Sequence, residues 1–375
     1  MEYSIEKAKE LVISAGKMLA ESGLIARTWG NISARTSDKK FAITPSGLAY
    51  ETLTPEQIVV VNIADCSYDG NIKPSSEKGI HADIYRLCPE VNFIIHTHQV
   101  MASVLSIEGK DIEVHNDEYK RILGDKVHCA AYGISSTKKL RKRVAEAISN
   151  YPESQSILMK NHGTICMGFN LEHSFEIALT LEKMAKEMYE TACGDDKEQI
   201  TQILDYGKSW RKEDTFILEC DGKTFEYRID ELPKDTPKVA LLHADIYKLG
   251  NAGHIIHSTD EEVVKVSSTG KVLRPFLDDL AQIVGVNIKT VKKGLINMKA
   301  ISKELKNKNA VLLENEGALC TGATKSDTEA ASMILRKGCA ADLYASALNI
   351  TDHISIADAY VQRFFYITKY SKMKR

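Results

Sequence analysis

The stretch HADIYRL at residues 81–87 returns almost unchanged as HADIYKL at residues 243–249. Outward from this pair the match continues, because FIIHTHQ (93–99) has a counterpart in HIIHSTD (254–260), and MKNHGTICMG (159–168) has one in LENEGALCTG (313–322). Each block ends in a long helical pattern. Self-similarity of this kind indicates a duplicated structural unit. The chain is therefore expected to hold two copies of one fold.

The expected organisation has three parts. Residues 1–195 form the first copy, residues 196–234 a connector, and residues 235–375 a second copy without a counterpart for about the first seventy residues of the first. In the connector, Asp221-Gly222 separates two alternating runs, which predicts a β-hairpin. The first copy alternates hairpins with helices, so a layered α/β unit with many antiparallel strand neighbours is predicted.

The composition is that of a soluble globular protein, with 43% hydrophobic residues, 27% charged residues and a formal net charge of −2. Its 375 residues favour about two domains, and the charge balance does not indicate nucleic-acid binding. Residues 1–23 show an amphipathic helical pattern rather than a signal peptide, and no apolar run is long enough to span a bilayer. The eight cysteines contain no CxxC pair, which indicates reduced thiols and a cytoplasmic location.

Two histidines stand one residue apart near the end of the apolar, β-branched run at residues 92–100. Positions i and i+2 of a strand project from the same face, so His96 and His98 can contact one ion. His162 lies in Asn-His-Gly between two apolar strand patterns, and the glycine after it indicates a close approach of the backbone. The alternative for these histidines is an ordinary hydrogen-bonded side chain.

Glu77 is the fourth candidate ligand. It follows Pro-Ser-Ser and precedes a helical pattern, so Ser75 or Ser76 is the expected N-cap and Glu77 is expected in the first helical turn. The helix dipole favours a carboxylate there, which leaves an ordinary capping role as the alternative to metal binding.

The second copy helps to decide between these alternatives. Its residues at the positions of Glu77, His96, His98 and His162 are Val239, His257, Thr259 and Glu316. Three of the four candidates are therefore replaced together, whereas His81, Asp83 and Tyr85 recur as His243, Asp245 and Tyr247. If the four candidates act together at one metal site, a copy that loses the site is expected to lose several of them while it keeps the residues that support the fold. The recurring residues are interpreted as structural.

Five motifs in order over residues 30–163, namely GNIS, TPSG, PSSE, HTH and NHG, resemble the class II aldolase/adducin family, most closely its L-fuculose-1-phosphate aldolase branch. The resemblance covers most of residues 1–195, and the second copy resembles the family only from about residue 235, without the site. It implies a tandem of three-layer α/β/α sandwiches, each around a central, mostly antiparallel sheet, with the active site at a subunit boundary.

The resemblance further implies that His96, His98 and His162 hold one zinc ion in the N-terminal domain. Glu77 would be the fourth ligand at rest, and the catalytic base or acid when substrate displaces it. Three imidazoles with one exchangeable position are also the pattern of a catalytic zinc site. Zinc bound to the hydroxy-ketone oxygens of a substrate would stabilise the enediolate that C–C cleavage forms.

A phosphate cradle and a proton donor are implied in the same way. The cradle consists of Asn31, Ser46, Gly47, Ser75 and Ser76. Their hydroxyl, amide and backbone N–H groups suit a phosphate dianion, although turns and caps are their alternative roles. Tyr132, in HCAAYGIS, matches the tyrosine that family aldolases use as a proton donor at the leaving aldehyde.

The predicted function is the zinc-dependent cleavage of a ketose 1-phosphate, similar to fuculose 1-phosphate, to dihydroxyacetone phosphate and an aldehyde. The alternatives are a pentulose-phosphate 4-epimerase, a sugar-phosphate decarboxylase or dehydratase, and a non-catalytic adducin-like assembly protein. Within the family, aspartate at the Glu77 position marks the epimerases, so Glu77 favours an aldolase. A homo-oligomer that binds a small sugar phosphate, and neither nucleic acid nor membrane, is expected.

Overall fold

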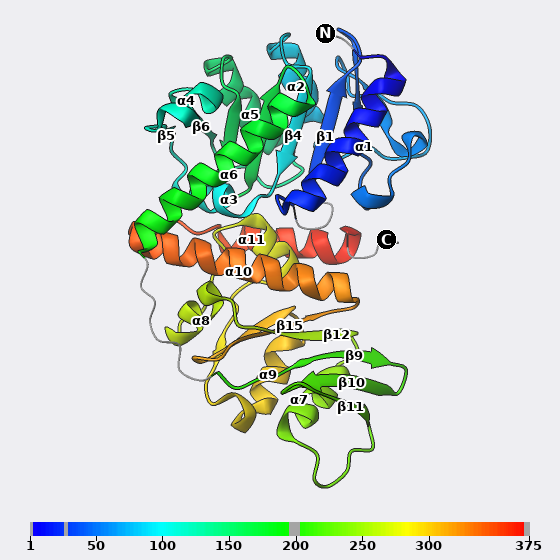
Figure 1. Ribbon diagram of the computed structural model, residues 1–375, viewed down its shortest axis with the longest axis vertical. Coiled ribbons are helices and arrows are strands. Elements are labelled where there is room, and N and C mark those ends of the chain that lie inside the picture. Colours follow the sequence, from blue (N-terminus) through cyan, green and yellow to red (C-terminus); the bar gives the residue numbers. More distant parts are fainter. Residues whose placement is uncertain (1–2, 26–28, 195–202, 371–375) are drawn as a thin grey trace. The chain divides into compact units, whose positions relative to one another are not determined.

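The computed structural model describes residues 3–25, 29–194 and 203–370. The chain divides into two compact units, the first of residues 1–192 with 368–375 and the second of residues 193–367. Each unit is a β-sheet with helices packed on it (Figure 1). Among the described residues, none of the helices combines the length and the apolar character that crossing a bilayer requires.

In the described part of the first unit, the strands form one eight-stranded sheet in the order β3-β2-β1-β4-β8-β7-β6-β5, antiparallel except between β6 and β7. The strands are β1 (Gly30–Arg35), β2 (Lys40–Ile43), β3 (Val59–Asn62), β4 (Phe93–Thr97), β5 (Ile112–Glu113), β6 (Lys126–Ala130), β7 (Ser156–Met159) and β8 (Gly163–Gly168). The helices are α1 (Ile5–Ser22), α2 (Lys78–Leu87), α3 (Val100–Leu105), α4 (Asp117–Leu123), α5 (Lys138–Asn150) and α6 (Leu171–Cys193).

Helices cover both faces of this sheet. On one face, α2 and α5 contribute Ile84 and Val144 to a buried cluster with strand residues such as Ile94. On the other face, Figure 1 shows α1 and α6, and Ser174 of α6 donates a hydrogen bond to the backbone oxygen of Phe93 in β4. The predicted three-layer arrangement with a mostly antiparallel sheet is confirmed.

The helix predicted at the N-terminus is α1. Ser4 caps it by accepting a hydrogen bond from the backbone N–H of Lys7, and the helix stops at Gly23, whose φ of 72° is left-handed. Its buried residues Ala8, Val12, Ala15 and Leu19 recur at helical spacing, because this face of the helix packs on β1 and β2.

The second unit repeats this architecture with the strand order β11-β10-β9-β12-β15-β14-β13. Its strands are β9 (Lys208–Lys212), β10 (Thr215–Cys220), β11 (Lys223–Arg228), β12 (His254–Ser258), β13 (Thr290–Val291), β14 (Ala310–Leu313) and β15 (Gly317–Gly322). Its helices are α7 (Lys238–Tyr247), α8 (Glu261–Ser268), α9 (Met298–Leu305), α10 (Lys325–Ala347) and α11 (Ile356–Phe365), and residues 280–284 form a π-helical turn. A second π-helical turn, at residues 366–370, begins at the end of this unit.

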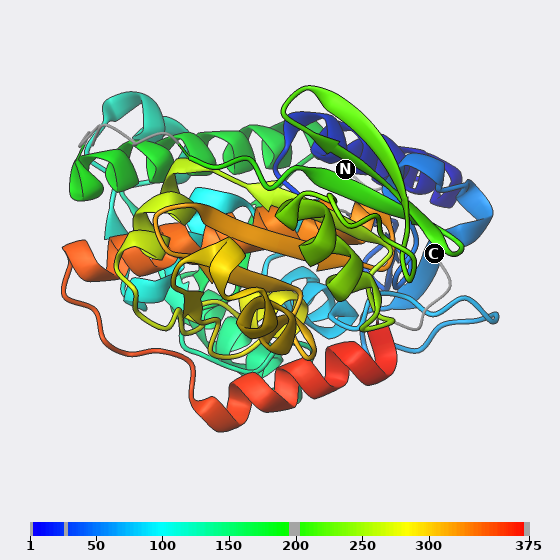
Figure 2. The ribbon, with the colours of Figure 1, turned by 90° about the horizontal axis from the view of Figure 1, so that it is seen from below.

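Residues 203–234, the described part of the expected connector 196–234, differ from that expectation in their strands. The predicted hairpin at Asp221-Gly222 is present, but β9, β10 and β11 continue the sheet of the second unit through pairing of β9 with β12 (Figures 1 and 2). They occupy the positions that β1, β2 and β3 hold in the first sheet. The second copy therefore has counterparts for these strands, because its sheet edge needs the same strands to complete the core.

Candidate metal centre

Strand β4 brings the first two histidines together. His96 is its fourth residue and His98 follows its last, so both rings project to the same side, with centroids 4.9 Å apart. His96 is buried and His98 is half-buried. The expectation that the i, i+2 spacing places both imidazoles side by side is confirmed.

The third ring is that of His162, which lies in the turn between β7 and β8. Its centroid lies 5.3 Å from that of His96 and 4.5 Å from that of His98, and a nitrogen from each ring lies within 4.8 Å of the others. Gly163 is required next to His162, because a Cβ at this position would lie 2.5 Å from the backbone oxygen of Thr97. The close approach predicted from Asn-His-Gly is therefore present.

The side chain of Glu77 faces this cluster and makes no capping hydrogen bond. Its Oε2 lies 3.1 Å from Nε2 of His96, and its Oε1 lies 3.5 Å from Nε2 of His162. The prediction that Ser75 or Ser76 is the N-cap was wrong, because Glu77 itself is the N-cap of α2 and its side chain makes no capping hydrogen bond. Ser75 Oγ accepts a hydrogen bond from the Glu77 backbone N–H.

The donor set fits a divalent cation. Burial alone would raise the pKa of the Glu77 carboxyl, but its contacts with His162 and His96 outweigh burial and hold that pKa well below its usual range. Nδ1 of His96 donates a hydrogen bond to the backbone oxygen of Thr164 at 2.7 Å, so Nε2 is the ring atom left to bind a cation on the side of Glu77. Three imidazoles and one carboxylate in a mostly buried site match the ligands that zinc prefers.

The five predicted phosphate-binding residues lie on three neighbouring segments. Asn31 on β1 donates from Nδ2 to Oε2 of Glu77 at 3.2 Å. The loop of Ser46 and Gly47 lies against the segment before α2, since the Ser46 N–H donates to the Lys73 oxygen and the Ser75 N–H donates to the Thr44 oxygen. Ser75 is buried and Ser76 is exposed.

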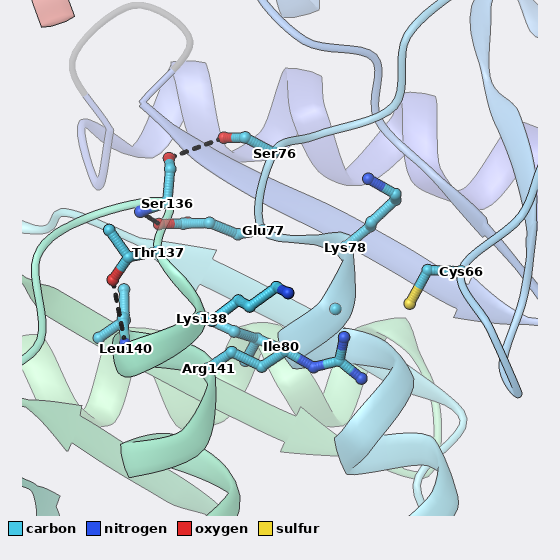
Figure 3. Close-up of a pocket in the computed structure, with 11 residues that line it drawn as sticks. Cys66, Ser76, Glu77, Lys78, Ile80, Ser136, Thr137, Lys138, Leu140 and Arg141 are labelled. Carbon is cyan, nitrogen blue, oxygen red and sulfur yellow. Dashed lines mark hydrogen bonds between the residues drawn. The ribbon is translucent and has the colours of Figure 1, made fainter.

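The loop between β6 and α5, residues 131–137, reaches the same carboxylate (Figure 3). The backbone N–H of Ser136 donates to Oε1 of Glu77 at 3.3 Å, and the Ser136 and Ser76 hydroxyls are 2.8 Å apart. A pocket opens here between the N-termini of α2 and α5, and Lys138 also lines it. Tyr132 is half-buried on the same loop.

Sequence reasoning missed Ser136. The available signal was Ser-Ser-Thr at residues 135–137 directly before the α5 pattern, which marks a helix start in the same way as Pro-Ser-Ser before α2. Only the structure shows that the two helix starts meet at one carboxylate.

In the second unit the equivalent position is filled by hydrogen bonds among the protein's own groups. Nε2 of His257 donates to the backbone oxygen of Glu316 at 2.6 Å, and the Tyr206 backbone N–H donates to Nδ1 of the same ring at 3.3 Å. The Tyr206 hydroxyl donates to Oε2 of Glu316 at 2.6 Å. Both nitrogens of the one retained histidine are therefore engaged, as expected for a copy without the metal site.

Comparison with known proteins gives a family match over most of the chain. The Class II Aldolase and Adducin N-terminal domain matches residues 10–189 and again residues 196–343. The second match includes β9 to β11, in agreement with the sheet of the second unit.

Individual relatives match about half of this chain. A 5-deoxy-D-ribulose 1-phosphate aldolase of Bacillus thuringiensis is 31% identical over 50% of this chain and 86% of its own length. The L-fuculose phosphate aldolase of Escherichia coli is 29% identical over 54% of this chain and 95% of its own. A probable L-ribulose-5-phosphate 4-epimerase of Mycoplasma pneumoniae is 30% identical over 48% and 81%. A solved L-fuculose 1-phosphate aldolase has a TM-score of 0.46 and 30% identity, over 50% of this chain and 86% of its own.

Proposed function

The chain belongs to the class II aldolase and adducin family, and on that premise we propose that its first unit is a zinc-dependent aldolase that cleaves a ketose 1-phosphate to dihydroxyacetone phosphate and an aldehyde. The single observation that carries this proposal is the convergence of Glu77 with the three histidines in the first unit. The catalytic domain would be residues 1–195.

His96, His98 and His162 would hold the cation, with Glu77 as the fourth ligand at rest. When bound, the cation would supply a Lewis acid for the negative charge that develops on the substrate carbonyl oxygen as the bond between C3 and C4 breaks. Family metal dependence and the fixed tautomer of His96 support this assignment.

Glu77 would move the proton. Its carboxylate borders both the histidine cluster and the pocket, so it can reach a substrate carbon held beside the cation site. After the C3–C4 bond breaks, C3 of the dihydroxyacetone phosphate half must gain a proton, and Glu77 would deliver it. In cleavage, Tyr132 would accept the proton that the C4 hydroxyl loses as the leaving aldehyde forms, and it would donate that proton to the aldehyde oxygen in the reverse condensation.

The phosphate would lie against Asn31, Ser46, Gly47, Ser75 and Ser76. The three segments that carry these residues adjoin one another and Glu77, which supports a common role. The exposed Ser76 hydroxyl, at the start of α2, suits an anion because backbone N–H groups at a helix N-terminus favour negative charge.

A homo-oligomer in the cytoplasm is the expected setting. The cysteines of the described residues are free thiols, which supports a reducing compartment, and the family resemblance supports an active site shared between chains. The second unit would be structural, because its equivalent position is filled by Tyr206 and Glu316.

The test is a cleavage screen of the full chain loaded with zinc. Ketose 1-phosphates would be offered, and released dihydroxyacetone phosphate would be measured through a coupled NADH-dependent reductase. The expected result is cleavage of at least one of them, and loss of about 10²- to 10⁴-fold in kcat for Glu77→Gln, since general acid–base catalysis contributes that much.

Glu316→Gln is the matched control, because it alters the carboxylate at the corresponding place in the second unit and should leave kcat unchanged. The relative named as an epimerase makes 4-epimerisation of a pentulose 5-phosphate the second candidate. Epimerisation without cleavage in the same screen would replace the aldolase assignment. Absence of stoichiometric metal from active protein would also refute it.

A further inference from the structure

A continuous line of buried hydrogen bonds ends at Glu77. The hydroxyl of Tyr85 lies 2.7 Å from Oγ of Ser33, and that Oγ lies 2.6 Å from Nδ1 of His81. Nε2 of His81 contacts Oδ1 of Asn31, whose Nδ2 reaches Oε2 of Glu77 at 3.2 Å. All five side chains are at most 8% exposed, so water does not compete for these bonds.

The chemistry of the groups fixes the direction of every bond. A carboxylate only accepts, so the amide nitrogen of Asn31 must donate to Glu77 and its amide oxygen must accept from Nε2–H of His81. Burial, and then the neighbouring His96, lower the pKa of His81 to about 3, so the ring is neutral and its Nδ1 accepts from Ser33. Ser33 in turn accepts from the Tyr85 hydroxyl.

The second unit keeps the hydrogen bonds among the tyrosine, the serine and the histidine, but not the bonds that connect the histidine to a carboxylate. Ser209 Oγ lies 2.7 Å from Nδ1 of His243 and 2.6 Å from the hydroxyl of Tyr247. Nε2 of His243, however, donates to the backbone oxygen of Tyr206 at 2.9 Å, so the line ends on the main chain. The chain thus carries the same buried triad twice, once connected to a metal-site carboxylate and once not.

We propose that His81 is a positioning residue of the active site, because it sets the amide orientation of Asn31 and thereby holds the Glu77 carboxylate toward the histidine cluster. This deepens the proposed function and rests on it for the catalytic role of Glu77. With the other tautomer of His81, the Asn31 amide would have to flip and would turn its oxygen toward the carboxylate. Ser33 completes the arrangement that Glu77 requires, since its hydroxyl can donate to Nδ1 of the tautomer that carries its proton on Nε2.

The experiment compares His81→Leu, His81→Gln and His243→Leu in the full chain. Zinc affinity is measured by competition with a chelator, and kcat and KM by cleavage. His81→Leu is expected to lower zinc affinity and kcat by about 10- to 100-fold, the usual effect of removing a group that orients a ligand, with KM little changed. His81→Gln should recover most of both, because its amide can accept from Ser33 and donate to Asn31.

His243→Leu removes the same contacts with Ser209 in the second unit and should leave zinc affinity and kcat as in the wild type. Equal effects of the two leucine variants would overturn the proposal, and so would His81→Gln behaving like His81→Leu. If His81→Leu does not fold, Ser33→Ala with Ser209→Ala as its control makes the same comparison with a smaller change.

A double-mutant cycle with Glu77→Gln separates this inference from the proposed function. If His81 acts through Glu77, adding His81→Leu to Glu77→Gln should not lower zinc affinity further. An undiminished effect in that background would refute the positioning role. Failure of the wild type to cleave any ketose 1-phosphate would refute the proposed function alone, because the cycle reads cation affinity and needs no turnover.

Discussion

Asp83 joins helices α2 and α5, and its replacement by asparagine should destabilise the first unit. Its Oδ2 lies 2.6 Å from Nε of Arg141, and its Oδ1 lies 2.8 Å from Nη2 of Arg141 and 2.7 Å from Nη1 of Arg86. The substitution Asp83→Asn keeps the shape of the side chain but removes its charge, which weakens three charge-assisted hydrogen bonds.

The size of the effect follows from the burial of the partners. Breaking a fully buried pair costs about 3–5 kcal/mol, whereas an exposed pair contributes about 0–1 kcal/mol. The Asp83 side chain is 11% exposed, but Arg141 is 38% and Arg86 46% exposed, so both guanidinium groups can be hydrated again after the change. We therefore expect a loss of about 2 kcal/mol, or about 4–8 °C in Tm for a unit of this size.

The assay can address each unit separately, because the chain has two tryptophans, Trp29 in the first unit and Trp210 in the second. In a Trp210→Phe background, urea unfolding followed by tryptophan fluorescence reports on the first unit. The midpoint should fall for Asp83→Asn with an unchanged m-value, since the same surface is exposed on unfolding.

Asp245 provides the matched control. It recurs at the Asp83 position but has no ion-pair partner among the residues that the structure describes, so Asp245→Asn followed in a Trp29→Phe background should change stability by less than about 0.5 kcal/mol. An equal effect of both substitutions, or a change of less than about 0.5 kcal/mol for Asp83→Asn, would show that the bidentate contact does not stabilise the helix pair.

Three further predictions concern the site loop, the second unit and the tyrosine. Ser136 has a left-handed φ of 60°, so Ser136→Gly should keep the hydrogen bond from the backbone N–H to Glu77 and retain activity. Ser136→Val should lower the zinc affinity measured by chelator competition, because a β-branched residue disfavours that φ. Ser135→Val is the control in the same loop, and an equally large effect there would contradict the argument. Burial lowers the pKa of His243 to about 4 from 6.5, so the unfolded state binds a proton that the folded state does not, and the stability of the second unit should fall by up to about 1.4 kcal/mol per pH unit between pH 6.5 and 4. Urea unfolding in the Trp29→Phe background measures this slope, and His243→Gln should flatten it. Tyr132→Phe should lower kcat for cleavage with zinc affinity unchanged, and an unaltered kcat would exclude Tyr132 as the group that transfers the proton at the aldehyde oxygen.

His81, Asp83 and Tyr85 recur in the second copy and were therefore predicted to have structural roles. For His81 and Tyr85, the contacts that both units share agree with this prediction. His81 packs with Ser33 and Tyr85 as His243 does with Ser209 and Tyr247. Its bond to Asn31 could not be predicted, because fifty residues of chain separate the two side chains and only the pairing of β1 with β4 and the packing of α2 bring them together.

The sequence by itself determined the duplication and the four side chains of the candidate metal centre. An i, i+2 pair on a strand and a glycine beside the third histidine are local patterns, and local geometry dictates where such side chains point. The tertiary structure alone decided that β9 to β11 complete the second sheet, since strand pairing is a long-range contact, and Ser-X-Arg at residues 33–35 and 209–211 is too short a match to predict it. It also decided that Ser136, Asn31 and the histidines meet at Glu77, because hydrogen bonds between distant segments exist only once packing has fixed the distances between them.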